Sequence, residues 1–81
     1  MKNLKTNVSI KFTTIEEYRE IERTLVSMGY KIDALWNTTQ LIRFENTCKP
    51  YYLFIDLSFT CAVYSFPPSE IKYNSLQEFL T

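Results

Sequence analysis

Two neighbouring runs of apolar residues, 51–57 and 60–66, constrain the fold of this chain more than any other feature. Alternate side chains of a β-strand point to opposite faces of the sheet, so each run divides into two sets. A sheet built from these strands needs cover on both faces, because both sets are apolar. One face would carry Tyr51, Leu53, Ile55, Leu57, Cys61 and Val63, and the other would carry Tyr52, Phe54, Ala62, Tyr64 and Phe66.

The first third of the chain predicts one strand and one long helix. Residues 8–12 alternate between apolar and polar side chains, which is the period of a half-buried strand. Thr14 and Glu17 fit a capping box, and apolar residues then recur at helical spacing until Gly29 ends the helix. Such a helix of about 14 residues is about 21 Å long at 1.5 Å per residue. It can cover one face of a small sheet and cannot cover both.

The middle of the chain predicts two further strands. Residues 30–36 alternate between apolar and polar side chains, and residues 37–39 have the composition of a turn. Residues 40–45 then fit a second strand, so we expect a hairpin between them. Pro67 and Pro68 end the last strand, since neither can donate a hydrogen bond to a ladder.

The end of the chain completes the predicted fold. Ser75 and Glu78 fit a second capping box, which would open a helix over 76–80 with Leu76, Phe79 and Leu80 facing inward. Residues 1–81 therefore predict a single α+β domain, in which one amphipathic helix packs on a mainly antiparallel sheet of four to five strands, with a short C-terminal helix. We expect the first strand to reach a parallel neighbour by a right-handed crossover.

Charge and length exclude several classes of partner. Lys plus Arg and Asp plus Glu each number nine, so the chain lacks the positive charge of a nucleic-acid-binding protein. No apolar stretch approaches the roughly 20 residues that span a membrane, and no export signal is recognisable, which predicts a cytoplasmic protein. A domain of 81 residues has a thin stability margin, so a homodimer or larger oligomer is expected as one means of support.

The residues available for catalysis or metal binding are few. The chain contains no His, and Cys48 and Cys61 alone cannot complete an ordinary zinc site, so we expect no metal and no cofactor. Asp56 and Cys48 are the remaining catalytic candidates, but Asp56 is better explained as an acceptor for the turn at Ser58. The sequence therefore predicts a protein that is not an enzyme.

Aromatic residues near the predicted strands are the candidate binding residues. Trp, Tyr and Arg most often dominate binding energy in protein interfaces. Two alternatives to binding stay open: the rings complete a small core, or residues 67–74 fold across the second sheet face. The candidate binding residues are Trp36, Arg43, Tyr51, Tyr52, Phe54, Tyr64 and Phe66.

The chain also resembles small accessory proteins of phages of low-GC bacteria. The resemblance rests on the Thr-initiated helix with Glu16, Glu17 and Tyr18, on Met28-Gly29-Tyr30-Lys31, and on the closing segment 75–80, and it covers residues 8–33 and 51–81. It implies an accessory protein that binds and inhibits a host enzyme or defence factor. Our first prediction is accordingly a non-enzymatic interaction module, and the alternative is an oligomeric binder or sponge for a small ligand or nucleotide.

Overall fold

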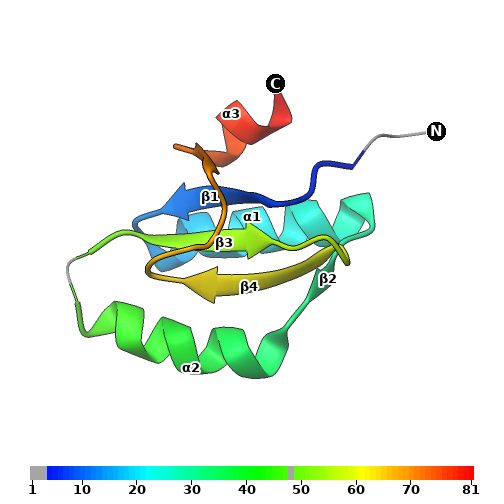
Figure 1. Cartoon of the computed structure of the whole chain (residues 1–81). Helices are drawn as coiled ribbons and strands as arrows, with labels where there is room; N and C mark the ends of the chain where they lie inside the picture. The colour runs from blue at the N-terminus through cyan, green and yellow to red at the C-terminus, as the bar shows by residue number, and fades with distance from the viewer. Residues whose placement is uncertain (1–3, 48) are drawn as a thin grey trace.

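The computed structural model describes residues 4–47 and 49–81, which form three helices and one five-stranded sheet (Figure 1). This arrangement confirms the predicted α+β class, including the short C-terminal helix. In chain order the elements are β1 (Val8–Phe12), α1 (Ile15–Met28), β2 (Lys31–Ile32), α2 (Ala34–Glu45), β3 (Tyr51–Ile55), β4 (Thr60–Tyr64), β5 (Ile71–Tyr73) and α3 (Leu76–Leu80).

The strands are ordered β2-β4-β3-β1-β5, and the sheet is mixed. Strand β3 is central and runs antiparallel to both β1 and β4, whereas β5 is parallel to β1 and β2 is parallel to β4. It follows that β2 runs parallel to β1, but β3 and β4 lie between them. The predicted crossover to a neighbouring strand is therefore wrong, because helix α1 carries the chain past two positions in the sheet.

Local capping determines where α1 begins and ends. The Thr14 hydroxyl accepts a hydrogen bond from the Glu17 amide at 3.1 Å, and the Glu17 carboxylate accepts from the backbone amides of Thr13 and Thr14. These bonds, with that from Thr13 largest, lower the pKa of Glu17. Gly29 closes the helix with a φ of 108°, in the left-handed region that glycine adopts at little cost. The predicted helix and both of its caps are confirmed.

The predicted hairpin over residues 30–45 is wrong, because most of this segment forms helix α2. Asp33 caps the helix by accepting a hydrogen bond from the Trp36 amide at 3.2 Å. The buried positions Asn37, Gln40 and Phe44 follow at helical spacing. Two of these three are polar, so the pattern of apolar residues does not reveal the helical period, and only β2 remains of the two predicted strands.

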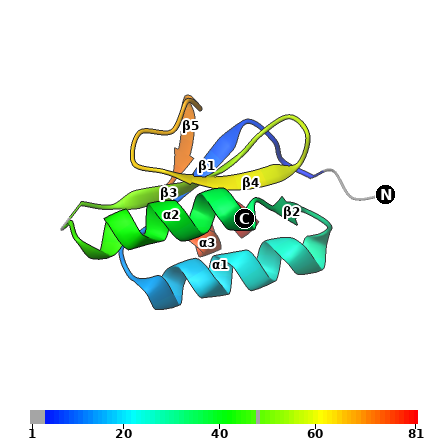
Figure 2. The same ribbon diagram turned by 90° about the horizontal axis from the view of Figure 1, so that it is seen from below.

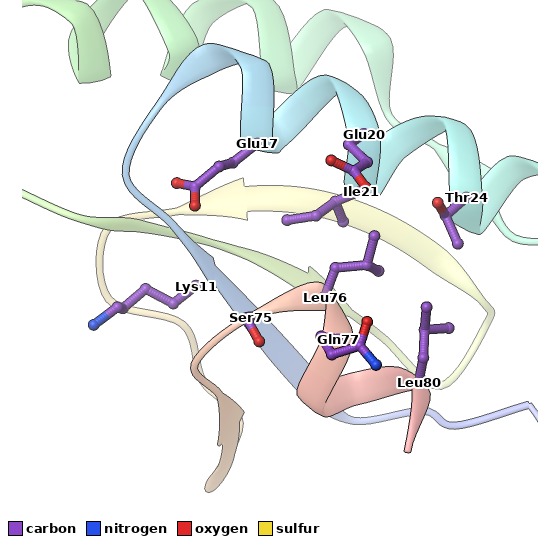
Figure 3. A pocket seen from close by; sticks show the side chains of 9 residues that line it. All are labelled: Lys11, Glu17, Glu20, Ile21, Thr24, Ser75, Leu76, Gln77 and Leu80. Atoms are coloured by element: carbon purple, nitrogen blue, oxygen red, sulfur yellow. The ribbon is translucent and has the colours of Figure 1, made fainter.

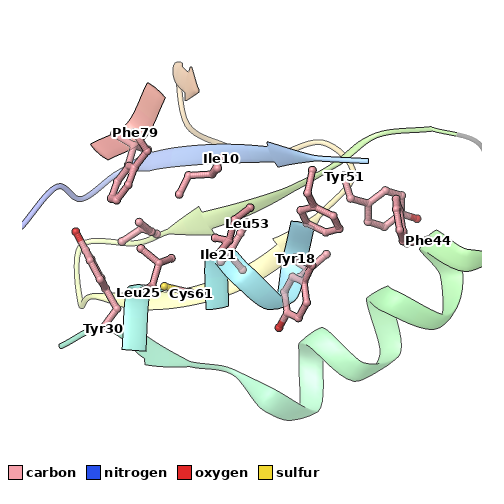
Figure 4. Packing of buried hydrophobic residues seen from close by; sticks show 14 residues of the cluster. Ile10, Tyr18, Ile21, Leu25, Tyr30, Phe44, Tyr51, Leu53, Cys61 and Phe79 are labelled. Carbon is pink, nitrogen blue, oxygen red and sulfur yellow. The ribbon is translucent and has the colours of Figure 1, made fainter. Parts of the chain in front are cut away.

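Helix α1 covers one face of the sheet, which we call the inner face (Figure 2). Its buried residues Ile21 and Leu25 belong to the same core as Leu53 of β3 (Figure 4). Burial alternates strictly along β3 and β4, which confirms the predicted division of their side chains into two faces. Leu57 is an exception, since it lies in the turn after β3 and is exposed.

The last segment closes the side of the core next to β1. Phe79 of α3 is buried between the rings of Tyr30 and Tyr73, with ring centroids 6.5 and 5.6 Å away. The Lys5 ammonium group lies 5.0 Å from the Tyr73 and Phe79 ring centroids and donates to the Phe79 carbonyl. Leu80 is exposed, so the prediction that it faces inward is wrong: the short helix turns only one large side chain fully into the core.

Candidate functional site

The face of the sheet opposite α1, which we call the outer face, gathers most of the predicted binding residues. Tyr52 lies opposite Tyr64 across the β3–β4 pair, and Phe54 lies opposite Ala62. All four side chains are partly exposed, whereas Leu53, on the same strand but pointing inward, is fully buried. The outer face is therefore an apolar surface that is only partly covered, unlike the inner face, which lies under α1.

Three rings form a continuous contact across this face. The Tyr64 ring lies 5.7 Å from the Trp36 ring and 5.8 Å from the Phe54 ring, centroid to centroid. The Phe54–Tyr64 pair has the edge-to-face geometry that aromatic quadrupoles favour. With Tyr52 beside Tyr64, we call these four residues the aromatic strip. It extends from α2 across β4 to β3, so its members come from three elements.

Trp36 reaches the strip because α2 lies along the edge of β4 (Figures 1 and 2). Its indole Nε1 donates to the Val63 carbonyl at 2.7 Å, and the Asn37 Oδ1 accepts from the Val63 amide at 2.8 Å. These side chains satisfy both backbone groups of Val63 where β2 no longer pairs with the strand. The Trp36 ring is held by this bond while 40% of the residue remains exposed.

The connection from β4 to β5 crosses the outer face in front of β3 and β1 (Figures 1 and 2). Ser69 and Ser9 are both buried, and their hydroxyl groups share a hydrogen bond. Ser69 also donates to the Ile71 carbonyl at 3.1 Å, so Ser9 is the donor to Ser69. The expectation that residues 67–74 fold across this face is met in part: Ser69 covers Ser9, and Pro67 and Lys72 line a pocket with Tyr52, while residues 71–73 extend the sheet as β5.

Phe66 stays exposed beside this connection and borders a pocket. Phe66 is 83% exposed, and the sheet contributes Tyr52 of β3 and Lys72 of β5 to the pocket. The volume is about 310 Å³, and the surface that lines it is mainly apolar with a lysine from each of two segments. We call it the lysine-flanked pocket; it is lined by Lys49, Pro50, Tyr52, Ser65, Phe66, Pro67 and Lys72.

A second hollow of about 310 Å³ lies between α1 and α3 (Figure 3). Its apolar part is formed by Ile21, Leu76 and Leu80, and its polar rim carries both signs of charge. One of the two carboxylates, that of Glu17, is already engaged in capping α1. Because its rim carries charges of both signs, this hollow favours neither an acidic nor a basic ligand, unlike the lysine-flanked pocket. The polar rim consists of Lys11, Glu17, Glu20, Thr24, Ser75 and Gln77.

Two predicted binding residues lie away from the outer face. Tyr51 is buried on the inner face, with its ring 5.2 Å from that of Phe44, because residues adjacent in a strand point to opposite sides. Arg43 is exposed on α2 and not on a strand as predicted. No pattern in the sequence indicates that Asn37 holds Val63, because residues 37–39 have the composition of a turn.

Asp56, one of the two groups considered for catalysis, is engaged in a turn, and the thiol of Cys61 is buried. Burial raises the pKa of the Cys61 thiol to about 12, so it is protonated at neutral pH. The Asp56 carboxylate accepts hydrogen bonds from the amides of Ser58 at 2.8 Å and Thr60 at 3.0 Å, which confirms the predicted turn. Cys48 lies outside the described residues. Within the described part of the chain, no group of three or more His, Cys, Asp or Glu residues could hold a metal ion.

No helix in residues 4–47 and 49–81 has the length and apolar character needed to cross a membrane. Comparison of the chain with family models, with curated proteins and with solved structures gives no match in any of the three. The geometry of the outer face is therefore the basis for assigning a function.

Proposed function

We propose that this chain is a non-enzymatic interaction domain that binds a partner protein through its outer face. The observation that carries the proposal is the aromatic strip, in which Trp36, Tyr64 and Phe54 remain partly exposed although they contact one another. The β4–β5 connection is the only part of the described chain drawn across that face in Figure 1, and the residues of the strip keep part of their surface exposed. Large rings that are fixed in place lose little conformational entropy when a partner covers them.

The sheet supports this role by fixing the rings before binding. Tyr52 and Tyr64 sit on paired strands, and Trp36 is fixed by its bond to the Val63 carbonyl. Binding surfaces built on strands and helices are more precise than surfaces built on loops. An inhibitor of a host or defence protein is the form of this function that the resemblance to phage accessory proteins implies, and it is part of the proposal.

The alternative, a small-ligand or nucleotide binder, would require a groove between two copies of the chain. Tyr51 could not line that groove, because it is buried on the inner face. Trp36 and Tyr52 could take part, and they are also the residues a protein partner would contact. Sedimentation equilibrium of the intact chain separates the two cases, since the oligomeric binder must self-associate at micromolar concentration and the interaction domain need not.

The proposal is tested with Tyr52→Ala and Phe54→Ala in capture of partner proteins from cell lysate, followed by titration with the purified partner. We expect each variant to lose more than tenfold in affinity, which corresponds to about 1.4 kcal/mol, while circular dichroism shows the native fold. Leu35→Ala is the matched control, because Leu35 is an exposed apolar residue of α2 that does not belong to the strip. Equal affinity in all variants would refute a binding role for the outer face.

A further inference from the structure

We infer that the lysine-flanked pocket receives one apolar side chain of a partner segment that carries acidic residues close to it on both sides. This inference rests on the proposed function and specifies the chemistry of the partner. It assigns to the pocket a role separate from that of the aromatic strip, with which it shares only Tyr52.

The pocket is assembled from three segments that the sheet brings together. The chain at and just before the start of β3 contributes Lys49, Pro50 and Tyr52, the chain after β4 contributes residues 65–67, and β5 contributes Lys72. These segments meet because β3 and β4 are antiparallel, so the start of one lies beside the end of the other. Pro50 and Pro67, two of the residues that line the pocket, restrict the backbone there. The hollow therefore exists before a partner arrives.

The size of the pocket suits a single side chain. Sites for whole small molecules span roughly 300–1,000 Å³, and this pocket of about 310 Å³ lies at the lower limit. The Tyr52 and Phe66 rings and the two prolines offer apolar surface for an aromatic or large aliphatic group. Phe66, at 83% exposure, would be covered when such a group enters.

The two lysines of the lining determine which residues we expect beside the apolar side chain of the partner. Lys49 and Lys72 come from different segments, and the lining contains no acidic residue to neutralise them. The chain as a whole has no net charge, so the attraction for an acidic segment is local to this pocket. Single-stranded nucleic acid would also meet lysine and aromatic groups here, but its binding requires a basic groove that follows many phosphates. Two lysines favour a short acidic peptide.

The test is a selection of random twelve-residue peptides displayed on phage, performed with the intact chain. We expect the enriched peptides to carry an aromatic or large aliphatic residue with Asp or Glu within three positions on both sides. The tightest peptide is then labelled with fluorescein and titrated by anisotropy. Phe66→Ala should weaken binding about tenfold, and its exposure means that the fold is retained. Lys49→Gln with Lys72→Gln should weaken binding about tenfold as well, with a smaller dependence on salt.

Lys31→Gln is the matched control, because Lys31 is exposed on β2 at the opposite edge of the sheet and should leave the affinity unchanged. Absence of enrichment, enrichment of neutral or basic peptides, or an unchanged affinity in the double lysine variant would overturn the inference. So would tighter binding of a labelled ten-nucleotide oligothymidine than of the peptide, or self-association of the chain that Phe66→Ala abolishes. If the lysine variants are silent while Tyr52→Ala still abolishes partner capture, the proposed function stands and only this inference fails.

Discussion

The two faces of the β3–β4 hairpin differ in what covers them, although both are apolar. On the inner face Leu53 and Val63 are fully buried under helix α1. On the outer face Phe54 and Tyr64, their neighbours in sequence, are only partly covered. The hairpin thus places side chains needed for folding and side chains available for binding one residue apart. Mutations on the two faces should therefore affect different properties of the protein.

The inner face should give the largest effect on stability. Leu53→Ala removes a fully buried side chain and leaves a cavity, so we expect a loss of about 3–4 kcal/mol in the free energy of unfolding. Phe54→Ala on the outer face should lose less than half as much, because its ring is partly solvated already. Denaturant titration of both variants decides the matter, and equal losses would mean that the outer face is part of the core.

Mutations at the edge of β4, where the two faces meet, should give the second largest loss of stability. Asn37→Ala leaves the Val63 amide without its acceptor in a buried place, so we expect a loss of about 2–3 kcal/mol. Trp36→Phe removes the indole donor to the Val63 carbonyl together with part of the ring surface, and should lose about 1 kcal/mol. Hydrogen exchange of the Val63 amide should become faster in Asn37→Ala and change little in Trp36→Phe. Faster exchange in Trp36→Phe than in Asn37→Ala would show that the Trp36 ring, and not the Asn37 side chain, protects this edge.

The same edge shows why part of the fold could not be predicted from the sequence. The limits of α1 are set by neighbours in the chain, Thr14 with Glu17 and then Gly29, so the local pattern was sufficient. The polar face of α2 is stabilised by partners far along the chain: Asn37 binds the Tyr18 hydroxyl 19 positions away and the Val63 amide 26 positions away. Such partners are known only once the strands are placed.

The candidate site was predictable to a similar extent, for the same reason. Alternation along 51–66 was enough to place Tyr52, Phe54 and Tyr64 on one face. It could not show that Lys72 joins them, because β5 has only three residues and its position depends on pairing with β1. Lys72 therefore entered the site through the topology of the sheet and not through any motif.

Alkaline pH should also lower the free energy of unfolding, through Cys61 on the inner face. We expect a smaller loss than from Leu53→Ala or Asn37→Ala. Burial raises the pKa of the Cys61 thiol to about 12, whereas in the unfolded chain the thiol ionises near its ordinary value of 9.0. The folded state therefore keeps a proton that the unfolded state releases, so stability is complete below pH 9 and falls as the pH rises above it, by up to about 1.4 kcal/mol per pH unit.

Denaturant titrations between pH 8 and 10.5 measure this dependence, and Cys61→Ala is the control that removes the thiol. We expect the variant to be less stable at pH 8 but to lose less on going to pH 10. Burial also raises the pKa of Tyr18, so some decline should remain in the variant at the upper end of the range. Parallel curves for the two proteins would contradict the role assigned to the thiol.

Phe66→Ala on the outer face should have the smallest effect on stability. This residue is therefore the sharpest test of the difference between the faces. Phe66 is 83% exposed, so Phe66→Ala removes almost no buried area and should change the free energy of unfolding by less than about 0.5 kcal/mol. The exposed ring would instead contribute when a partner covers it. A clear loss of stability in this variant, measured by thermal and denaturant unfolding, would show that Phe66 packs against the protein itself. The outer face would then have a structural role, and the contrast with the inner face would disappear.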